Sequence, residues 1–413
     1  MRLFRAMKGI YNVGLRGSTL VLRFVLSFYI IKSLGFEASG IYGLAVGVIG
    51  ITPAVVGWGL NYYVSRDVVG KSSGFAGERI KSRLLVTTIS LTLVTILSVI
   101  VTLALGYEIN HLYVLVVVVV WLETYALDIH VPLIAQEMAL EANVLVFTRS
   151  ALWVPFVTVG GILFPALRNL ETVFACWILS YVVTIAVLFY FIRKWPLRET
   201  AKAPIHYDWI KDRLKASYFI YFSDLSIVGL IYADRYIVNF MLGLTLTGIY
   251  TFYWSLTNAL QTLISTAVVQ LALPVLFKAA SNGSTAEWRH TMNRQFIKTT
   301  AMACGMGLAV WIGCELLIRY LSMSQLGEHR GVFLLLLMAS IVRSISDLLN
   351  VGLTSLKKDN HYATINLLGV CLAIGVATVM IAIFGFVGTG IAALVTALII
   401  AGLRAAYLFN FTR

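Results

Sequence analysis

Long apolar runs separated by short polar segments make up most of the chain. Windows of about twenty residues, the helix length that crosses the hydrocarbon core of a bilayer, give twelve candidate spans. Lipid offers no hydrogen-bond partners to the backbone, so each span must be a helix. Strands of a barrel would alternate in polarity, and residues 114–120 do not. We therefore predict an all-α integral membrane protein with twelve transmembrane helices, near residues 10–32, 40–64, 82–105, 110–133, 143–167, 171–193, 215–240, 245–277, 296–320, 330–356, 361–384 and 387–410.

Composition supports this prediction and excludes a soluble protein. Hydrophobic residues make up 59% of the chain and charged residues 12%, with a mean hydropathy of +0.87. A soluble domain is about half apolar and about a quarter charged. The net charge of +13 would favour nucleic acid as a partner only in a soluble domain. The four cysteines and six histidines are scattered without ligand spacing, so we expect no metal and no cofactor.

The basic residues indicate the orientation, because Lys and Arg collect in cytoplasmic loops. With the N-terminus in the cytoplasm, about 22 of the 32 Lys and Arg lie in inside loops. Only Lys32, Arg168 and Arg330 then lie in outside loops, and the remaining seven arginines fall within spans. We predict that both termini are cytoplasmic.

A repeated motif divides the chain into two halves. The pattern L-G-x-x-x-x-G-I-Y occurs at 34–42 and again at 242–250, an offset of 208 residues. Six spans separate the copies, so the halves run in the same direction, as a parallel repeat about an axis along the membrane normal with a central cavity. We predict an N-terminal six-helix lobe over 1–194, a cytoplasmic linker over 195–214 and a C-terminal six-helix lobe over 215–413.

Ionisable residues inside spans indicate function, since each costs about 2.5–3.5 kcal/mol at the bilayer centre unless it is paired or solvated. The first and seventh spans each carry polar residues spaced three or four apart, on one helical face. The 208-residue offset maps Arg16 onto Asp224 and Ser27 onto Arg235, so we expect the two stripes to face each other across the cavity. The candidate substrate-binding residues are Arg16, Arg23, Tyr232, Arg235, Asn239 and Arg343.

Other intramembrane charges have two interpretations each. Arg343 and Asp347 are spaced as an intrahelical pair, which is either a self-contained salt bridge or part of the cavity. Glu123 shares a helical face with His130, as a proton-linked pair or only a helix contact. Arg404 lies near the inner end of the last span, where we expect it to snorkel. The candidate coupling or charge-positioning residues are Glu123, Asp224, Asp234 and Asp347.

Two prolines lie in equivalent spans of the two halves. Pro53 is in the second span and Pro274 in the eighth. Proline bends a membrane helix where neighbours can satisfy the freed carbonyl groups. These residues are candidates for gating, and static kinks that serve packing are the alternative.

Two segments of the chain resemble a known family. Residues 34–66, with the repeated motif followed by Gly-Trp-Gly-Leu-Asn at 57–61, resemble the first two spans of polysaccharide flippases. Residues 234–250, followed by Leu273 and Pro274, resemble the start of their second half. The chain is similar to O-antigen flippases of the Wzx type, in the superfamily that includes multidrug exporters and the peptidoglycan-precursor flippase.

The resemblance implies two six-helix lobes in a V that open alternately to each side of the bacterial inner membrane. The expected cargo is an oligosaccharide on undecaprenyl diphosphate, moved to the periplasmic leaflet during lipopolysaccharide O-antigen synthesis. H+ or Na+ would be the coupling ion, and a polysaccharide polymerase and chain-length regulator would be partners. Guanidinium forks suit phosphate oxygens, so Arg23 and Arg235 would meet the diphosphate.

Two alternatives compete with a flippase. A drug exporter of the same superfamily would share the fold, but a less basic cavity without mid-span arginines would suit its cargo. A membrane polymerase or glycosyltransferase needs a sizeable extramembrane loop that holds sugars and catalytic groups. The longest predicted outside loop has about ten residues and no paired carboxylates, so we do not expect an enzyme.

The predicted orientation can be tested with reporter fusions to the full-length protein. Fusions after positions 70, 200 and 285 should report a cytoplasmic location, and fusions after 36, 108, 244 and 386 a periplasmic one. A periplasmic signal at position 200 would contradict both the orientation and the parallel repeat.

Overall fold

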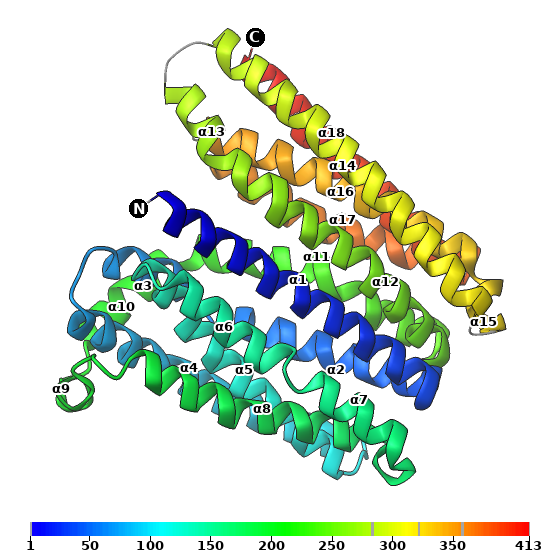
Figure 1. Cartoon of the computed structure of the whole chain (residues 1–413), viewed down its shortest axis with the longest axis horizontal. Helices are drawn as coiled ribbons and strands as arrows, with labels where there is room; N and C mark the ends of the chain where they lie inside the picture. The colour runs from blue at the N-terminus through cyan, green and yellow to red at the C-terminus, as the bar shows by residue number, and fades with distance from the viewer. Residues whose placement is uncertain (1, 282–284, 321–322, 357–358, 413) are drawn as a thin grey trace. The chain divides into compact units, whose positions relative to one another are not determined.

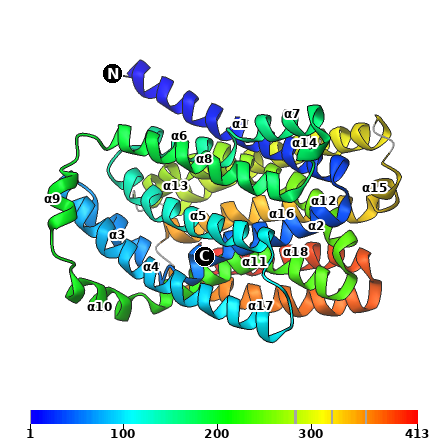
Figure 2. The same ribbon diagram turned by 90° about the horizontal axis from the view of Figure 1, so that it is seen from below.

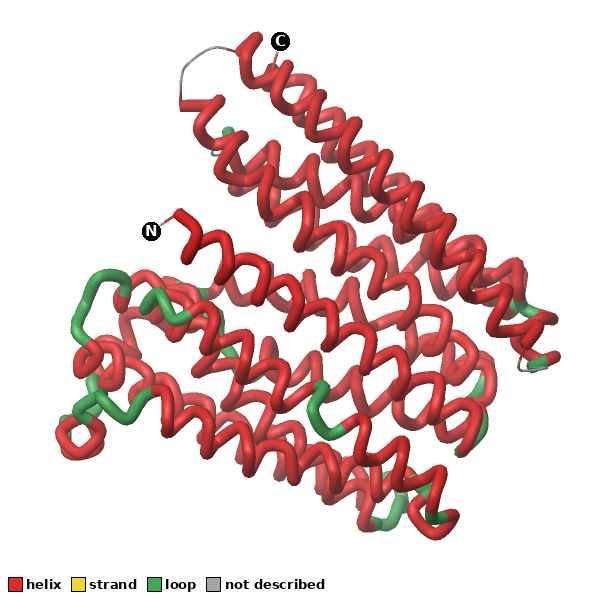
Figure 3. Tube along the Cα trace, in the orientation of Figure 1, coloured by secondary structure: helices red, strands yellow, loops and turns green. Residues whose placement is uncertain are grey.

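The computed structural model describes residues 2–281, 285–320, 323–356 and 359–412, and every regular element in these ranges is a helix (Figure 3). Twelve helical segments are long and apolar enough to cross a membrane. They agree with the twelve predicted spans to within a few residues at most ends, and the largest differences lie at the second, third and ninth spans. The predicted all-α fold with twelve transmembrane helices is confirmed.

Contacts divide the chain into two compact units. Unit 1 is Met1–Leu34 with Leu44–Val228, and unit 2 is Gly35–Gly43 with Gly229–Arg413. This division differs from the predicted boundary at residues 195–214 in two ways. It falls inside a helix, Tyr218–Leu242, and it assigns the beginning of the second span to the unit of the C-terminal half.

Unit 1 is a bundle in which α8 packs against α5 and α6, and α1 packs against α6 and α7. Side chains with hydrogen-bonding oxygens begin several of its helices: Asn110 accepts the N–H of Tyr113, and Asn169 that of Thr172. The elements, blue to green in Figure 1, are α1 (Arg2–Ser33), α2 (Phe36–Val55), α3 (Leu60–Val68), α4 (Ser73–Ala104), α5 (His111–Ala135), α6 (Ala139–Ser150), α7 (Val154–Leu163), η1 (Pro165–Leu167), α8 (Leu170–Phe191), α9 (Leu197–Lys202), α10 (Tyr207–Ala216) and the first part of α11 (Tyr218–Leu242).

The predicted linker is a structured part of unit 1. Its helices α9 and α10 lie beside α3 and α4 (Figure 2). The Lys81 ammonium donates to the carbonyl groups of Ala201 and Ala203, at 2.7 and 2.6 Å, where α9 ends. Cations are favourable at this end of a helix because its last carbonyls lack partners. Trp209 of α10 donates its ring N–H to Asp67 of α3 at 2.7 Å. The segment is therefore held at both of its helices.

Unit 2 is built around α16, which packs against α12, α13, α14, α17 and α18. Many α16 side chains are buried, as expected for a helix surrounded by others. Its elements are residues 35–43, which are blue in Figure 1, and the segments drawn green to red: the rest of α11, α12 (Leu244–Ile264), η2 (Ser265–Val269), α13 (Gln270–Ser281), α14 (Thr285–Tyr320), α15 (Ser324–Glu328), α16 (Arg330–Ser355), α17 (Asp359–Phe384) and α18 (Phe386–Thr412).

The two copies of the repeated motif pack against each other within unit 2. Gly40 of α2 and Gly248 of α12 approach so closely that a Cβ on either would overlap a backbone carbonyl of the other helix. Ser39 Oγ donates to the Gly248 carbonyl at 3.2 Å. Small residues permit such an approach between membrane helices. The glycines of the motif therefore mark a helix crossing.

The contacts at this crossing are reciprocal. Gly40 lies against Leu244, and Gly248 lies against Phe36, which are equivalent pairs under the 208-residue offset. Thr245 Oγ1 donates to Glu37 at 3.4 Å, another pair separated by 208 positions. Reciprocal contacts are the mark of a two-fold axis. Gly43 also lies against Thr251, so two contacts along the helices share the offset of 208 and the helices run parallel, as the repeat predicted.

The second span of each half is interrupted at equivalent positions. In the first half α2 ends at Val55, and Trp58 and Gly59 have positive φ angles of 52° and 65° before α3 begins. In the second half the π-helical turn η2 covers Ser265–Val269, which corresponds to 57–61 under the offset. Such turns disturb the regular hydrogen-bond ladder and recur at functional sites. Pro53 precedes the first break and Pro274 follows the second.

We predict that Gly248→Ala lowers the thermal unfolding midpoint of the purified protein in detergent. The new methyl group meets a backbone carbonyl, which cannot rotate away as a side chain could, so the overlap should cost about 1–3 kcal/mol. The matched control is Gly375→Ala, at a helical glycine with no atom near the added Cβ. An unchanged midpoint for Gly248→Ala would contradict the close crossing.

Candidate functional site

The N-terminal helix carries the first two candidate arginines. Arg16 is half-buried and donates its Nε to Asn143 of α6 at 3.3 Å. Arg23 is exposed and lies within the span Gly14–Ser33. Its guanidinium has no hydrogen-bond or ion-pair partner among the residues that the structure describes. Asp224, in the part of α11 that belongs to unit 1, is likewise exposed.

A buried ion pair in unit 1 was missed by sequence reasoning. Arg83 is fully buried in α4, and its Nη2 lies 2.9 Å from Asp128 Oδ1 of α5. Asn61 accepts from Arg83 Nε at 3.0 Å, and Thr87 donates its hydroxyl to Asp128. Arg83 lies at the start of the predicted span 82–105, but it was counted with the basic residues of the preceding inside loop, whereas α4 begins at Ser73 and includes it. Arg83 and Thr87 are four residues apart and therefore share a helical face, and this spacing could have indicated a polar contact inside the bundle.

Glu123 interacts with Arg149 and Tyr181 rather than with His130. Arg149 Nη1 lies 2.5 Å from Glu123 Oε1, and the Tyr181 hydroxyl donates to Oε2. His130 Nδ1 is buried without a hydrogen-bond partner in the described ranges. The carboxylate, predicted as a coupling group, is thus held by partners on α6 and α8.

Arg235 of unit 2 is stacked on aromatic rings and almost fully buried, with 1% of its surface exposed. Its guanidinium carbon lies 3.9 Å from the ring centroid of Trp254 and 5.0 Å from that of Tyr232. These distances are in the cation–π range. Nη1 donates to the Gly43 carbonyl at 3.1 Å, whereas Nε and Nη2 have no hydrogen-bond partner in the described part of the chain. Two guanidinium nitrogens therefore lack a hydrogen-bond partner among the described residues.

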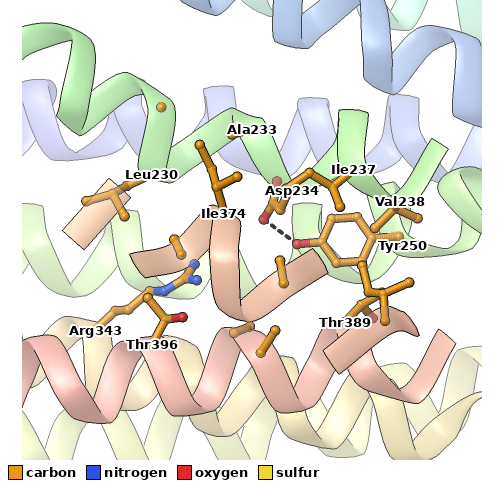
Figure 4. Close-up of a pocket in the computed structure, with 16 residues that line it drawn as sticks. Leu230, Ala233, Asp234, Ile237, Val238, Tyr250, Arg343, Ile374, Thr389 and Thr396 are labelled. Atoms are coloured by element: carbon orange, nitrogen blue, oxygen red, sulfur yellow. Dashed lines mark hydrogen bonds between the residues drawn. The ribbon is translucent and has the colours of Figure 1, made fainter. Parts of the chain in front are cut away.

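Asp234 lies beside a small cavity inside unit 2 (Figure 4). It accepts a hydrogen bond from the Tyr250 hydroxyl, and the charge of Arg343 acts on it. The cavity has a volume of about 40 Å³, more than the roughly 10–15 Å³ that a water molecule needs. Thr396, whose buried hydroxyl lacks a partner among described residues, also lines it. Arg343 reaches this cavity from α16 without any hydrogen bond or ion pair to a described residue.

The structure corrects two predictions on Asp347 and Arg404. Asp347 pairs with Arg404 at 3.6 Å and accepts from Gln261 at 3.0 Å, so the intrahelical salt bridge with Arg343, one of the two interpretations, does not form. Arg404 is buried and donates to Asn366 Oδ1 at 2.9 Å, instead of snorkelling. The reason is tertiary, because the packing of α18 against α16 brings Arg404 to Asp347.

The remaining candidates lie at different depths. Tyr232 and Asn239 are half-buried on α11, and Tyr232 contacts the Arg235 guanidinium. Pro53 is half-buried in α2, and Pro274 is exposed on α13. Neither proline lies in the interruption itself.

The intramembrane arginines fall into two groups by their partners. Arg83, Arg149 and Arg404 are each paired with a carboxylate, so their charges are compensated inside the protein. The second group has no carboxylate partner among the described residues. An arginine without an acid attracts anions and forms bidentate hydrogen bonds with phosphate or carboxylate oxygens. This group consists of Arg16, Arg23, Arg235 and Arg343.

Comparison with solved structures defines the class of fold. An inward-facing multidrug resistance MATE family transporter of the MOP superfamily aligns over 98% of both chains, with a TM-score of 0.77 and 12% identity. An outward-facing MATE transporter of that superfamily aligns over 98% of this chain and 95% of its own, with a TM-score of 0.63 and 14% identity. A mutant of the Vibrio cholerae MATE transporter VcmN aligns over 98% and 97%, with a TM-score of 0.61 and 15% identity. This chain has the MATE-type fold.

The sequence itself identifies the family. The profile of the polysaccharide biosynthesis protein family matches residues 6–280, more than half of the chain. The chain belongs to this family. No curated protein matches the sequence. The predicted relationship is confirmed at the level of the polysaccharide biosynthesis family, and the Wzx type stays a prediction.

We predict that Asp128→Ala strongly destabilises the protein, because Arg83 is left buried without its carboxylate. Removing one partner of a buried pair costs about 3–5 kcal/mol. The double variant Arg83→Met with Asp128→Leu should recover most of this loss, measured as the thermal midpoint in detergent. Glu315→Gln, which breaks a pair with the largely exposed Arg319, should change stability by only about 0–1 kcal/mol. Equal losses for both single variants would argue against a structural role.

Proposed function

We propose that the protein is a flippase that moves an oligosaccharide linked to undecaprenyl diphosphate from the cytoplasmic to the periplasmic leaflet of a bacterial inner membrane. It acts by alternating access, with H+ or Na+ as the coupling ion, and not as an enzyme. The observation that carries the proposal is the match to the polysaccharide biosynthesis family over residues 6–280, in a chain with twelve membrane-spanning helices and a MATE-type fold. O-antigen repeat units are the expected glycan class.

The diphosphate is the part of the cargo that would cost the most free energy to move through the membrane without the protein. Its negative charges cannot enter the hydrocarbon core without compensation. Arg23 suits this role because it is exposed within a span and lacks a described partner. A guanidinium can bind two phosphate oxygens at once. We therefore place Arg23 at the diphosphate, with Arg16, about two turns away on the same helical face, as a second cation.

Unit 2 supplies the remaining substrate-binding candidates. Arg235 offers Nε and Nη2, the two guanidinium nitrogens that have no hydrogen-bond partner in the described ranges. Arg343 adds a second charge without a carboxylate partner, and Tyr232 and Asn239 provide a ring and an amide for sugar hydroxyls. An aromatic ring offers an apolar face for packing, and a side-chain amide both donates and accepts hydrogen bonds.

The acids divide between coupling and positioning. Glu123 and Asp347 already hold arginines, which suits positioning. Asp224 is exposed, and Asp234 lies beside the water-sized cavity, which suits the binding of a coupling ion. Pro53 lies just before the interruption of its span, and Pro274 lies just after the interruption of the equivalent span, so we assign both to gating. Both termini face the cytoplasm in this proposal, and a polysaccharide polymerase and chain-length regulator act on the product.

A drug exporter is the second candidate, because the solved structures of similar fold are multidrug transporters. Their identities of 12–14% support a shared fold only. Several arginines without carboxylate partners disfavour cationic drugs, since like charges repel in a low-dielectric site. Cells that lack the gene should accumulate a lipid-linked glycan on the cytoplasmic leaflet if the flippase proposal is right. Increased drug sensitivity without that accumulation would favour the exporter.

We predict that Arg23→Ala abolishes export of surface polysaccharide while the protein still inserts at its normal level. Arg23→Lys keeps the charge but loses bidentate geometry, so it should restore export only in part. Arg23→Glu should be at least as defective as alanine, because it repels the anionic cargo. Surface polysaccharide and cytoplasmic lipid-linked glycan are measured together in a complemented deletion strain.

The control for this prediction is Arg319→Ala, which removes an exposed arginine that already has a carboxylate partner. It should leave export unchanged. For Arg235, the alternative to cargo binding is an anchoring role beside Asp234. The double neutral variant Asp234→Asn with Arg235→Gln tests it, because it leaves no uncompensated charge. Normal export by this double variant would make Arg235 a structural residue.

A further inference from the structure

A second, much larger cavity lies in unit 2, away from the residues assigned above. It is a groove between α14, α16 and α18, with a volume of about 1010 Å³. Its walls are mainly apolar, and Phe296, Leu398 and Phe409 are exposed within it. Ligand pockets typically have volumes of about 300–1,000 Å³. The groove is therefore large enough for a sizeable apolar ligand.

Both walls of the groove are attached to α16 by side-chain contacts. Trp288 of α14 is buried and donates its ring N–H to Ser355 Oγ at 3.0 Å. On the other wall, Arg404 of α18 is held by Asp347 and donates to Ser346 Oγ at 2.9 Å. Between these attachments α18 presents Ala401, Gly402 and Ala405, whose small side chains leave the space open.

One end of the groove is basic. Arg289 and His290 line it near the residue where α14 begins, and both are exposed. No Asp or Glu occurs among the lining residues that the structure describes. A slot that is apolar along its length and cationic at its mouth complements a lipid with an anionic head group. In the proposed orientation this mouth is at the cytoplasmic surface.

The length of the groove matches one leaflet of the membrane. Its lining residues on α18 run from Leu398 to Phe409, which at 1.5 Å per residue is about 16 Å. Half of the hydrocarbon core is about 15 Å. A chain in the groove would therefore run from the head-group region to about the middle of the bilayer.

We propose that this groove binds the polyprenyl chain of the carrier lipid, with the diphosphate at Arg289. This inference rests on the proposed function and extends it, because it gives the lipid tail a defined site on unit 2. A single slot suits one isoprenoid chain with a multiply charged head, whereas a phospholipid brings two acyl chains and one phosphodiester charge. Arg289 receives the cargo at the surface before the diphosphate reaches the intramembrane arginines.

Photocrosslinking of the full-length protein in phosphatidylcholine nanodiscs tests the proposal. The probes are a diazirine-bearing polyprenyl diphosphate and, in parallel, a diazirine-bearing phosphatidylglycerol, with labelled peptides mapped by mass spectrometry. We expect the polyprenyl probe to label residues 288–296 and 398–409 and an excess of unlabelled polyprenyl diphosphate to suppress it. Equal labelling of these segments by phosphatidylglycerol, or labelling that polyprenyl diphosphate does not compete away, would overturn the proposal.

Two matched pairs of variants sharpen the test. Ala405→Phe fills the groove, whereas Ala406→Phe adds the same ring at an exposed neighbour outside it. Arg289→Gln removes the charge at the mouth, whereas Arg294→Gln removes an exposed charge of the same helix outside the groove. The first member of each pair should lower labelling about tenfold, a loss of about 1.4 kcal/mol in binding, and the second should not. Ala401→Phe replaces Ala405→Phe if the latter fails to fold.

The inference and the proposed function can fail separately. Flipping is measured on the same preparations in proteoliposomes that contain a fluorescent lipid-linked glycan. Flipping by the wild-type protein without labelling of the groove would overturn the groove and leave the flippase intact. Specific labelling without flipping would support the groove as a polyprenyl diphosphate site and contradict the flippase.

Discussion

The close crossing of α2 and α12 fixes where the beginning of the second span packs, which is against the second half of the chain. Residues 35–43 belong to unit 2 while the rest of α2 belongs to unit 1, so this short segment joins the first half of the chain to the core of the second. The crossing exists because Gly40 and Gly248 carry no side chains. Gly35 and Gly243, with φ angles of 94° and 84°, allow the turns that precede both helices. One repeated motif therefore supplies both the turns and the contact.

The intramembrane arginines differ in role according to whether a carboxylate compensates their charge in the low-dielectric interior. A charge that is buried with its carboxylate partner, as in Arg83 and Asp128, is neutral at a distance and serves to hold helices together. A charge without such a partner keeps its field and must be compensated by water or by an anion. Arg23 is of this second kind within the described part of the chain, whereas the charge of Arg343 acts on Asp234 without a direct ion pair. The protein thus keeps its structural charges and its available charges on different residues.

The sequence was sufficient for the spans and the repeat but not for the ion pairs. Apolar length alone locates a membrane helix, and the offset of 208 residues correctly related Gly40 to Gly248. Ion pairs between helices depend on how the helices pack, and hydropathy gives no information about packing. Arg83 was assigned to a loop because a buried arginine at the end of a span has the same local pattern as a loop arginine. Asp347 was paired with its own helix because Arg404 is remote in sequence.

The reciprocal contact between equivalent residues has an evolutionary consequence. It has the form of an isologous interface, in which one surface patch binds a second copy of itself. A single ancestral half that carried L-G-x-x-x-x-G-I-Y would have had a self-complementary helix and would have formed a homodimer in the membrane. Tandem duplication of its gene would convert that dimer contact into the present intramolecular one. The equivalent positions 16 and 224 now carry Arg and Asp, so the two halves differ in charge where their helices correspond.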